Sequence, residues 1–384
     1  MSGEPQNIRK IRTVCHLSTA HPASDDRIFY KECCSLAANG YNVFYVAPHD
    51  RDEVIDGVSI LALPKTRSRT RRMLLNGWLA FRKGMKTGAR VIHFHDPELI
   101  PAGLLFKLFG RKVIYDVHEL VFHHLDHKPW LGPFTRRMMR SAYRFFEWFA
   151  IRSFDRIILV VDDDLFRDYF FKSYPKQQQK FLFIRNYCMV SFMDAQPRAE
   201  IPSGGRKVLI YAGGLSRERG IREVIRATAM LEEQPMLVLF GQWSDGYREE
   251  CMDEPGWKNV TEMGFRKLEE VYPYIKAADL GIAILYPLKN YMTSLPVKVF
   301  EYMACSKPVL MSDFPFWIKN FSDCAWFVDP QRPEKIAEVL KEILSNDRER
   351  EKRGTNGREL AIRKYSWESE EKSLLACYDE LFKK

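Results

Sequence analysis

The chain has 384 residues, of which 46% are hydrophobic and 28% are charged, and this length is enough for about two globular domains. The N-terminus lacks the apolar core of a signal peptide, and no apolar run reaches the roughly 18 residues of a membrane span, so we expect a cytoplasmic protein. The eight cysteines form no C-x-x-C pair and no metal-ligand spacing with the nine histidines, which argues against disulfides and against a metal site.

The net charge of +9 is unevenly distributed. Residues 1–200 contain 31 Lys and Arg against 21 Asp and Glu, a balance of +10, which leaves 28 against 29, or −1, for residues 201–384. Between Asp56 and Asp96 there is no acidic residue at all. The basic half could therefore face a polyanion or an anionic membrane, but no nucleic-acid recognition motif is present.

Short β-branched runs alternate with helical segments in the first half of the chain. This pattern predicts a parallel sheet covered on both faces. In chain order we expect strands at 12–18, 41–47, 58–64, 90–96, 112–118 and 155–161, and helices at about 26–39, 70–87, 98–109 and 133–152.

The alternation weakens across residues 186–207, where prolines and glycines indicate a linker, and then restarts. The fold class is therefore α/β, with two Rossmann-like doubly wound domains facing a cleft. We place the first domain at 1–187 and the second at 188–366, and expect a C-terminal helix at about 367–384 to pack back on the first. Strands are expected at 207–214, 236–241, 259–264, 279–285 and 308–313, with helices at about 220–232, 267–277, 296–305 and from 333 onward.

Ligands of such sheets bind beyond the carboxyl ends of the strands. In "YAGGLSRERGI" (211–221), Gly213 and Gly214 allow close backbone approach, and Arg217 and Arg219 could clamp a diphosphate. A strand-to-helix turn needs glycine in any case, so this motif alone is not specific.

In "NYMTSLPVKVFEYMACSKPVLMSD" (290–313), Pro296 suits the first turn of a helix, with Ser294 or Leu295 near its cap. Glu301 can then reach a group attached to a phosphate at that helix N-terminus, and Lys298 lies on the same face. An ordinary surface contact between Lys298 and Glu301 is the alternative.

These stretches, together with "HP...DDRIFYKE", "HFHDPELIPAG" and "YDVHEL", closely resemble the retaining sugar-nucleotide glycosyltransferases of family 4, which have the GT-B fold. The resemblance covers about residues 11–330. It implies that the second domain holds a nucleoside-diphosphate sugar without a metal or other cofactor, with UDP or GDP undecided. It also implies transfer to a glycan or lipid-linked acceptor with retention, in cell-surface polysaccharide or glycolipid synthesis.

The resemblance assigns the donor-side residues. Arg219 matches the basic residue that contacts the diphosphate, and Lys298 compensates for a second basic residue that is missing at Gly214. Glu301 matches the glutamate that binds the ribose, but Thr293 stands where the family has its other acidic residue. The remaining expected donor contacts are Gly213, Ser294, Leu295 and Pro296 near the phosphates, and Gly264, Phe265 and Arg266 beside the base.

On the acceptor side, the resemblance places His95, Asp96, His118 and Glu119 at two neighbouring strand ends. In front-face transfer the acceptor hydroxyl attacks on the side of the leaving group, and the diphosphate takes its proton, so no side-chain nucleophile is needed. Positioning and stabilisation of the diphosphate then carry catalysis. The residues expected to take part are Arg219, Lys298, His95 and Asp96.

The loop "HPASDDRIFYKE" is expected to face the acceptor, with Asp25 bonding sugar hydroxyls, Arg27 reaching a phosphate and Asp26 capping the following helix. Two further patterns carry no function in this interpretation. Asp162-x-Asp164 resembles a metal-binding motif but is expected to cap a helix, and the histidines at 118, 123, 124 and 127 form no recognised ligand set.

The basic, aromatic-rich segments 65–90 and 128–152 lead us to expect peripheral binding to an anionic membrane surface. A core helix with a solvated basic face is the alternative. Two other functions also remain open: a GT-B sugar-nucleotide epimerase, which needs no acceptor, and a non-catalytic sugar-nucleotide-binding relative.

Overall fold

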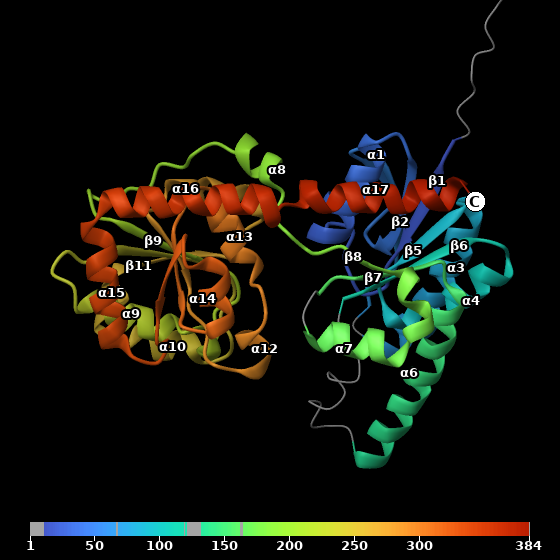
Figure 1. Ribbon diagram of the computed structural model, residues 1–384, viewed down its shortest axis with the longest axis horizontal. Helices are drawn as coiled ribbons and strands as arrows, with labels where there is room; N and C mark the ends of the chain where they lie inside the picture. The colour runs from blue at the N-terminus through green and yellow to red at the C-terminus, as the bar shows by residue number, and fades with distance from the viewer. Residues whose placement is uncertain (1–10, 67, 119, 121–131, 162–163, 384) are drawn as a thin grey trace, which may run out of the picture. The chain divides into compact units, whose positions relative to one another are not determined.

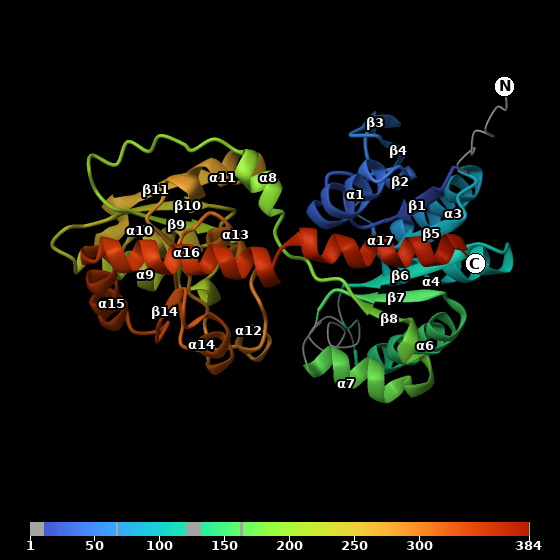
Figure 2. The same cartoon turned by 45° about the horizontal axis from the view of Figure 1, so that its top comes forward.

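The structure, a computed structural model, describes residues 11–66, 68–118, 120, 132–161 and 164–383. The chain divides into two compact units, one formed by Met1–Asn186 with Glu370–Lys384 and the other by Tyr187–Ser369. Each unit has its own parallel sheet with helices on both faces (Figures 1 and 2). This confirms the predicted fold class of two Rossmann-like doubly wound α/β domains.

The sheet of the first unit has eight strands, in the order β3-β4-β2-β1-β5-β6-β7-β8. All neighbours pair in parallel except the short edge strand β3, which is antiparallel to β4. The central strands are buried on both faces, as their continuous apolar sequences require. The strands are β1 (Thr13–Leu17), β2 (Asn42–Pro48), β3 (Glu53–Ile55), β4 (Val58–Leu63), β5 (Val91–Phe94), β6 (Lys112–Val117), β7 (Arg156–Leu159) and β8 (Phe181–Phe183).

Helices α3, α4 and α6 of the first unit pack side by side in that order. The chain between β1 and β2 forms a π-helix, η1, that continues as α1, where the sequence predicted one regular helix. None of the described helices combines the length and apolar character that a bilayer crossing requires. The helical elements are η1 (Asp26–Cys33), α1 (Cys34–Ala38), α2 (Arg69–Arg71), η2 (Arg72–Asn76), α3 (Gly77–Lys86), η3 (Pro97–Leu99), α4 (Ile100–Leu108), α6 (Pro133–Ser153), α7 (Asp164–Ser173) and η4 (Pro175–Lys180).

The sheet of the second unit has six parallel strands, in the order β11-β10-β9-β12-β13-β14. Apolar clusters fill both of its faces. The strands are β9 (Val208–Ala212), β10 (Met236–Phe240), β11 (Val260–Gly264), β12 (Leu280–Ala283), β13 (Val309–Ser312) and β14 (Ala325–Val328).

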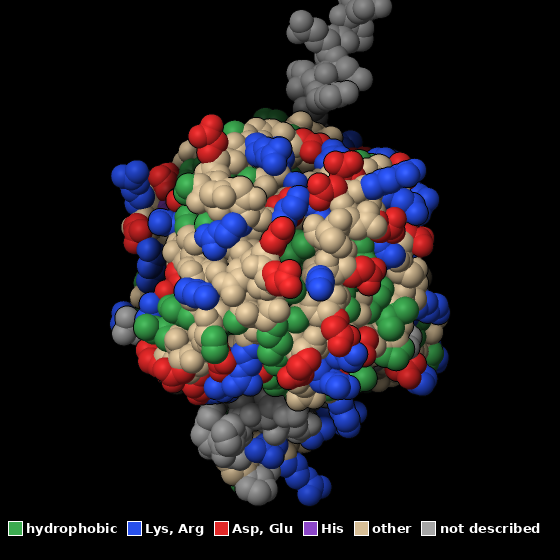
Figure 3. Space-filling model, turned by 90° about the vertical axis from the view of Figure 1, so that its left-hand side faces the viewer, with side chains coloured by type: hydrophobic (Ala, Val, Ile, Leu, Met, Phe, Trp, Pro, Cys, Tyr) green, Lys and Arg blue, Asp and Glu red, His purple; other side chains and the backbone are tan. Residues whose placement is uncertain are grey.

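Acidic and basic side chains alternate over the face of the second unit that Figure 3 shows, in keeping with the balanced charge of that half of the sequence. Its helical elements are α8 (Val190–Ala195), η5 (Arg217–Arg219), α9 (Ile221–Ala229), α10 (Tyr247–Met252), η6 (Pro255–Asn259), α11 (Leu268–Ala277), α12 (Lys289–Met292), α13 (Val297–Ala304), α14 (Pro315–Phe321), α15 (Pro333–Ser345) and α16 (Asp347–Lys364).

The last helix, α17 (Trp367–Lys383), contributes its C-terminal part to the core of the first unit. Tyr378 is fully buried there, and the Tyr41 hydroxyl donates a hydrogen bond of 2.8 Å to Asp379. Arg12 pairs with the same carboxylate. Residues about 180 positions downstream of the linker thus complete the first domain.

The cap of η1 is Asp25, and the prediction that Asp26 caps this helix is wrong. The Asp25 carboxylate accepts hydrogen bonds from the backbone N–H groups of Arg27 and Ile28, at 3.0 and 2.9 Å. Burial raises the pKa of Asp25, but the bonds from His21 and Ile28 outweigh it and lower the pKa to about 2. Asp26 pairs instead with Lys31.

Replacing Asp25 by Ala should lower the free energy of unfolding by about 1–2 kcal/mol, because two N–H groups lose their acceptor. Chemical denaturation at pH 7 measures this change. Ser24→Ala, at an exposed position one residue earlier, serves as the control and should change stability by less than about 0.5 kcal/mol. Equal stabilities of the two variants would contradict the capping role.

Candidate functional site

The strand order of the second unit contains one reversal, between β9 and β12. The chain leaves β9 toward β10 on one side and leaves β12 toward β13 on the other. Loops that follow two such strands diverge and leave a crevice at their carboxyl ends, where ligands of doubly wound sheets bind. The loops in question are 213–220 and 284–296, and Tyr286 N–H bonds the carbonyl of Glu218 between them at 2.8 Å.

Gly213 begins the first of these loops, and its position admits no side chain. Its φ of 142° lies in the region that favours glycine. A Cβ atom there would also lie 2.8 Å from Nζ of Lys298. Opposite it, a Cβ atom on Gly241 would lie 1.8 Å from the Gly213 carbonyl oxygen. The two glycines therefore allow the backbones of two neighbouring loops and a lysine to meet at one point.

Lys298 lies in the first turn of α13, and its ammonium group is buried 3.6 Å from the centre of the Tyr211 ring. Within the described part of the chain, Nζ has no hydrogen-bond partner. Burial and, next, the nearby charge of Arg219 lower the pKa of Lys298 well below its usual value, while Glu301 acts in the opposite sense. The alternative of a solvated surface contact with Glu301 is therefore wrong.

Two tyrosines surround this group of charges. The Tyr211 hydroxyl donates to the Gly214 carbonyl at 2.7 Å, and burial raises its pKa to about 12 although Arg219 lowers it. The Tyr272 hydroxyl donates to Oε1 of Glu301 at 3.1 Å. Neither tyrosine was identified from the sequence, because each reaches the site from the middle of an element and not from a loop motif.

The two arginines of the η5 turn have different surroundings. Arg219 is half-buried beside Tyr211 and Gly214, whereas Arg217 is exposed and pairs with Glu250. Gly220, which follows, has a φ of 61°, and a Cβ there would lie 2.6 Å from a methyl group of Ile284. Of the two arginines that the sequence proposed as a clamp, only Arg219 faces the lysine.

The second loop ends at α13, which begins at Val297 with Pro296 as its N-cap, one residue later than predicted. Thr293 is exposed and ends the short helix α12. The Ser294 carbonyl accepts a bond of 2.7 Å from the Trp317 indole, which fixes the loop before the helix. Leu295 packs against the core of the unit.

Gly264 is the last residue of β11, the edge strand, which is separated from β9 by β10, and Phe265 and Arg266 follow it. All three are exposed, and Arg266 approaches Glu270 at 3.9 Å. The Gly241 N–H bonds the Gly264 carbonyl at 2.9 Å. These residues thus flank the group around Lys298 and do not contact it in the bonds described.

In the first unit, His95 and Asp96 lie where β5 ends and His118 lies where β6 ends. His95 Nδ1 is 3.3 Å from His118 Nε2, and burial lowers the pKa of His95 to about 4. Asp96 is buried and accepts bonds from the backbone N–H groups of Thr19 and Ala20, at 2.6 and 3.2 Å. Glu119 lies outside the described residues, as do the histidines at 123, 124 and 127 and Asp162.

Arg27 does not lie at the surface, and the prediction that it reaches a phosphate of the acceptor is wrong. Only 3% of the residue is exposed, and Nε and Nη2 both donate to Oδ2 of Asp116, at 3.1 and 3.0 Å. The π-turn of η1 directs Arg27, Lys31 and Glu32 into the interior. This burial could not be predicted from the sequence, because charged residues at these positions are normally expected on a helix surface.

Two family models match the chain. The glycosyl transferase 4-like domain matches residues 27–162, and glycosyl transferases group 1 matches residues 193–360. Among curated proteins, spore coat protein SA of Bacillus subtilis is 24% identical over 48% of this chain and 51% of its own length. The putative teichuronic acid biosynthesis glycosyltransferase TuaC of the same organism is 32% identical over 28% of this chain and 25% of its own. The chain spans about half or less of the length of these relatives.

Solved structures of other proteins align with nearly the whole length of this chain. Sucrose-phosphate synthase of Thermosynechococcus elongatus superposes with a TM-score of 0.73 at 18% identity, covering 97% of this chain and 99% of the other. HepE of Anabaena, solved with UDP-glucose, gives a TM-score of 0.64 at 14% identity, covering 96% and 99%. Identities this low establish the fold alone.

Lys298→Met should raise the free energy of unfolding by about 1–3 kcal/mol at pH 7, because it removes a buried ammonium group that lacks a hydrogen-bond partner. With its pKa lowered on folding, Lys298 binds more protons in the unfolded chain, so wild-type stability gains from rising pH until the unfolded lysine also deprotonates. The advantage of the variant should therefore shrink toward pH 10.

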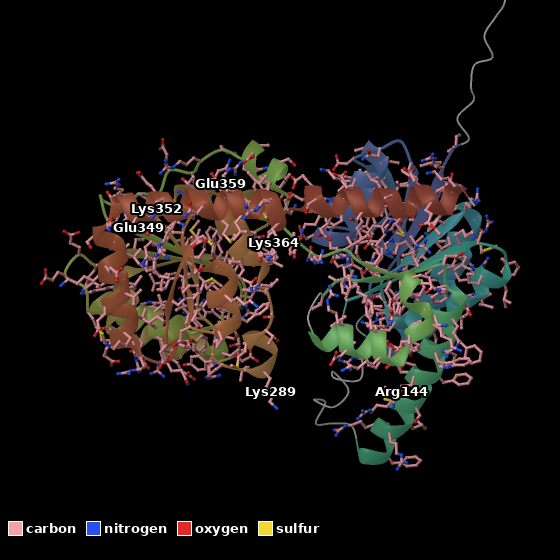
Figure 4. The ribbon with its side chains drawn as sticks, in the orientation of Figure 1. Arg144, Lys289, Glu349, Lys352, Glu359 and Lys364 are labelled. Atoms are coloured by element: carbon pink, nitrogen blue, oxygen red, sulfur yellow. The ribbon has the colours of Figure 1, made fainter. Side chains whose placement is uncertain are left out.

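Thermal unfolding between pH 7 and 10 measures this effect. Lys289→Met is the matched control, because Lys289 lies exposed on α12 (Figure 4) and its replacement should leave the pH dependence unchanged. A destabilised Lys298→Met variant would contradict the assignment of an uncompensated buried charge.

Proposed function

We propose that this chain, which carries a glycosyl transferase 4-like domain ahead of a group 1 glycosyl transferase domain in a GT-B fold, transfers a sugar from a nucleoside-diphosphate donor to a glycan or lipid-linked acceptor. One observation carries the proposal: Lys298, Arg219 and the glycine turn at Gly213 converge at the switch point of the second sheet. The positive charges of Lys298 and Arg219, beside a glycine backbone that a ligand can approach closely, suit the binding of a diphosphate.

Arg219 and Lys298 supply the positive charge of this site. As the bond between the sugar and the diphosphate breaks, negative charge grows on the leaving phosphate, and preorganised cations stabilise it. The backbone of 293–296 at the start of α13 can hold the distal phosphate. We therefore propose transfer that needs no metal ion or cofactor, with UDP or GDP as the leaving group.

We propose that Glu301 accepts hydrogen bonds from the ribose hydroxyls of the donor. It lies one turn after Lys298 on α13, and the Tyr272 hydroxyl at 3.1 Å fixes its carboxylate. Lys298 would contact the diphosphate, because a bound diphosphate would supply the anion that its buried ammonium group lacks. Gly264, Phe265 and Arg266 would lie beside the base.

We propose that the anomeric configuration is retained by front-face transfer. The acceptor hydroxyl attacks the anomeric carbon on the side from which the phosphate oxygen departs, and that oxygen receives the proton. Thr293, exposed at the end of α12, has no carboxylate to serve as a nucleophile. His118 and Asp25, which are partly exposed, are the proposed acceptor-side residues of the first unit. His95 and Asp96, which were expected beside them, are too deeply buried to contact an acceptor.

An exposed apolar surface on α3, α4 and α6, continued by η2 before α3, supports peripheral binding to an anionic membrane and a lipid-linked acceptor. The three helices are neighbours, and the ring centres of Phe81 and Phe109 lie 6.1 Å apart across α3 and α4. Basic residues such as Arg144 flank the surface (Figure 4). Its exposed apolar side chains are Met73, Leu74, Trp78, Leu108, Phe109, Phe134, Met138, Phe145, Trp148 and Phe149.

A buried carboxylate sets which face of α6 points outward. Glu147 is almost fully buried and accepts bonds of 2.9 Å from the hydroxyls of Tyr143 and Tyr174, with Tyr169 as a third partner. These bonds fix the inner face of the helix. Trp148 and Phe149, the next residues along the chain, consequently stay exposed. An apolar face held outward in this way suits an interfacial helix.

The two alternative functions predict different products. A sugar-nucleotide epimerase alters the donor without an acceptor, and a binding protein releases nothing. Incubation of the purified chain with nucleotide-sugars, with and without a panel of lipid-linked glycans, separates the three functions. Release of nucleoside diphosphate only when an acceptor is present supports transfer, and conversion of the donor alone supports the epimerase.

Arg219→Ala should weaken binding of the nucleotide-sugar about 10- to 100-fold, because charge-assisted bonds to the diphosphate are lost. Arg217→Ala is the matched control in the same turn, since Arg217 pairs with Glu250 at the surface, and its effect should stay below about threefold. Isothermal titration with UDP- and GDP-sugars measures both affinities. Undiminished affinity in Arg219→Ala and Glu301→Ala would contradict the site.

The double variant Trp148→Ala/Phe149→Ala should bind vesicles containing anionic lipid at least about tenfold more weakly than wild type, because two exposed aromatic rings no longer enter the interface. Flotation with anionic and neutral vesicles measures binding. Met230→Ala/Ile362→Ala, which removes exposed apolar side chains from the second unit, should bind like wild type. The membrane proposal would be overturned if the wild type bound anionic and neutral vesicles equally and neither double variant changed the binding.

A further inference from the structure

Four potential metal ligands meet in the core of the first unit. His16 comes from β1, His93 from β5, His95 from the residue after β5, and Glu32 from the π-helix η1. At most 2% of any of these residues is exposed. Their donor atoms all lie within 4.8 Å of one another. Charged and polar groups this deeply buried need compensation from their surroundings.

Four of the six distances between the donor atoms are close to the edge of a coordination tetrahedron, and the other two are at most 4.8 Å. Oε2 of Glu32 lies 3.7 Å from a ring nitrogen of each of the three histidines, too far for hydrogen bonds. His16 Nδ1 and His95 Nε2 are 3.1 Å apart. Zinc bonds of 2.0–2.2 Å place tetrahedral ligand atoms about 3.4 Å apart, between these values.

Two of the imidazoles also have an outer partner. The Tyr378 hydroxyl lies 2.9 Å from His16 Nε2, and Oδ2 of Asp116 lies 3.2 Å from His95 Nδ1. Such partners select the tautomer and hold the ring that coordinates a metal. In His93 the Tyr378 hydroxyl lies 2.8 Å from Nδ1, the nitrogen that faces Glu32, so a metal ion bound there would replace this contact.

The carboxylate of Glu32 is oriented by Arg27. Nη2 of Arg27 lies 3.0 Å from Oε1, so the other oxygen, Oε2, is the one directed at the imidazoles. Neither oxygen has a well-formed hydrogen bond within the described part of the chain. Arg27 is itself held by two bonds to Asp116. The carboxylate therefore has an orienting cation on one side and three lone-pair donors on the other.

We propose that one divalent metal ion, zinc by preference, binds in this core, held by the side chains of His16, Glu32, His93 and His95. Imidazole and carboxylate ligands in a four-coordinate arrangement suit zinc. Because all four ligands are buried, the ion is structural and takes no part in sugar transfer. It links β1, β5 and η1 and, through Tyr378, the C-terminal part of α17.

A second group of potential ligands, His95, Asp116 and His118, is a weaker candidate. It shares His95 with the first group, and its carboxylate already accepts two bonds from Arg27. His118 is also partly exposed. In the buried group with Glu32, Arg27 pairs with Oε1 only, and Oε2 is left facing the three imidazoles.

Metal content and cobalt spectroscopy of the full chain test the proposal. The purified protein, stripped with a chelator, should take up one Zn²⁺ per chain and unfold at a higher temperature with the ion bound. Co²⁺ in its place should give the intense visible bands of a tetrahedral site. A chain that neither takes up Zn²⁺ nor gives such bands with Co²⁺ would overturn the proposal and leave a hydrogen-bonded histidine cluster.

Three variants locate the ion. Glu32→Gln and His93→Ala should weaken zinc binding at least about 100-fold, and Tyr378→Phe, which keeps the ligands but removes the outer partner of His16, about 10- to 100-fold. His49→Ala, a histidine outside the group that lies beside Glu53, is the control and should bind like wild type. Equal zinc affinity in Tyr378→Phe, His93→Ala and His49→Ala would show that the metal binds elsewhere and overturn the assignment.

Discussion

Parallel strand pairing is the constraint on which both candidate sites depend. Except for the edge strand β3, the strands of each unit pair in parallel, so the loops that follow them all leave at the same edge of the sheet. In the second unit the reversal between β9 and β12 then separates two neighbouring loops. Lys298, Arg219 and Gly213 meet there because the sheet brings their loops together, although they are up to 85 residues apart in the sequence.

Each unit contains a buried charge that its neighbours do not fully compensate. Among the residues that the structure describes, Nζ of Lys298 has no hydrogen-bond partner and lies over the Tyr211 ring, and Glu32 faces three imidazoles with Arg27 on one side. Burying such groups lowers the stability of the fold, so a bound ligand of opposite charge would offset this cost. The opposite signs of the two charges favour opposite ligands, an anionic diphosphate for the lysine and a cation for the glutamate.

Sequence patterns predicted the turns and helix starts of the donor-side site, but they did not predict which charged and polar side chains are buried. The glycine turn at Gly213 and the helix that starts near Pro296 were predicted because turns and caps are local. Arg27 was misassigned, and Asp26 was chosen as the cap in place of Asp25, because which of two adjacent carboxylates turns toward the helix depends on a loop held by His21. Glu32 and Tyr378 gave no signal, since a buried polar residue looks like a surface residue in one sequence.

The sequence by itself determined the two α/β domains, most of their strands and the loops that carry the donor-side residues, because hydrophobic periodicity and turn chemistry act over a few residues. It missed the short edge strands β3, β8 and β14. Only the tertiary structure decided which charges are buried and what they face. Lys298 became an uncompensated cation by packing under Tyr211, and His16, Glu32, His93 and His95 became one cluster because parallel pairing sets β1 beside β5 and a π-turn directs Glu32 inward. Contacts between residues some 80 positions apart follow from sheet topology, which no local pattern encodes.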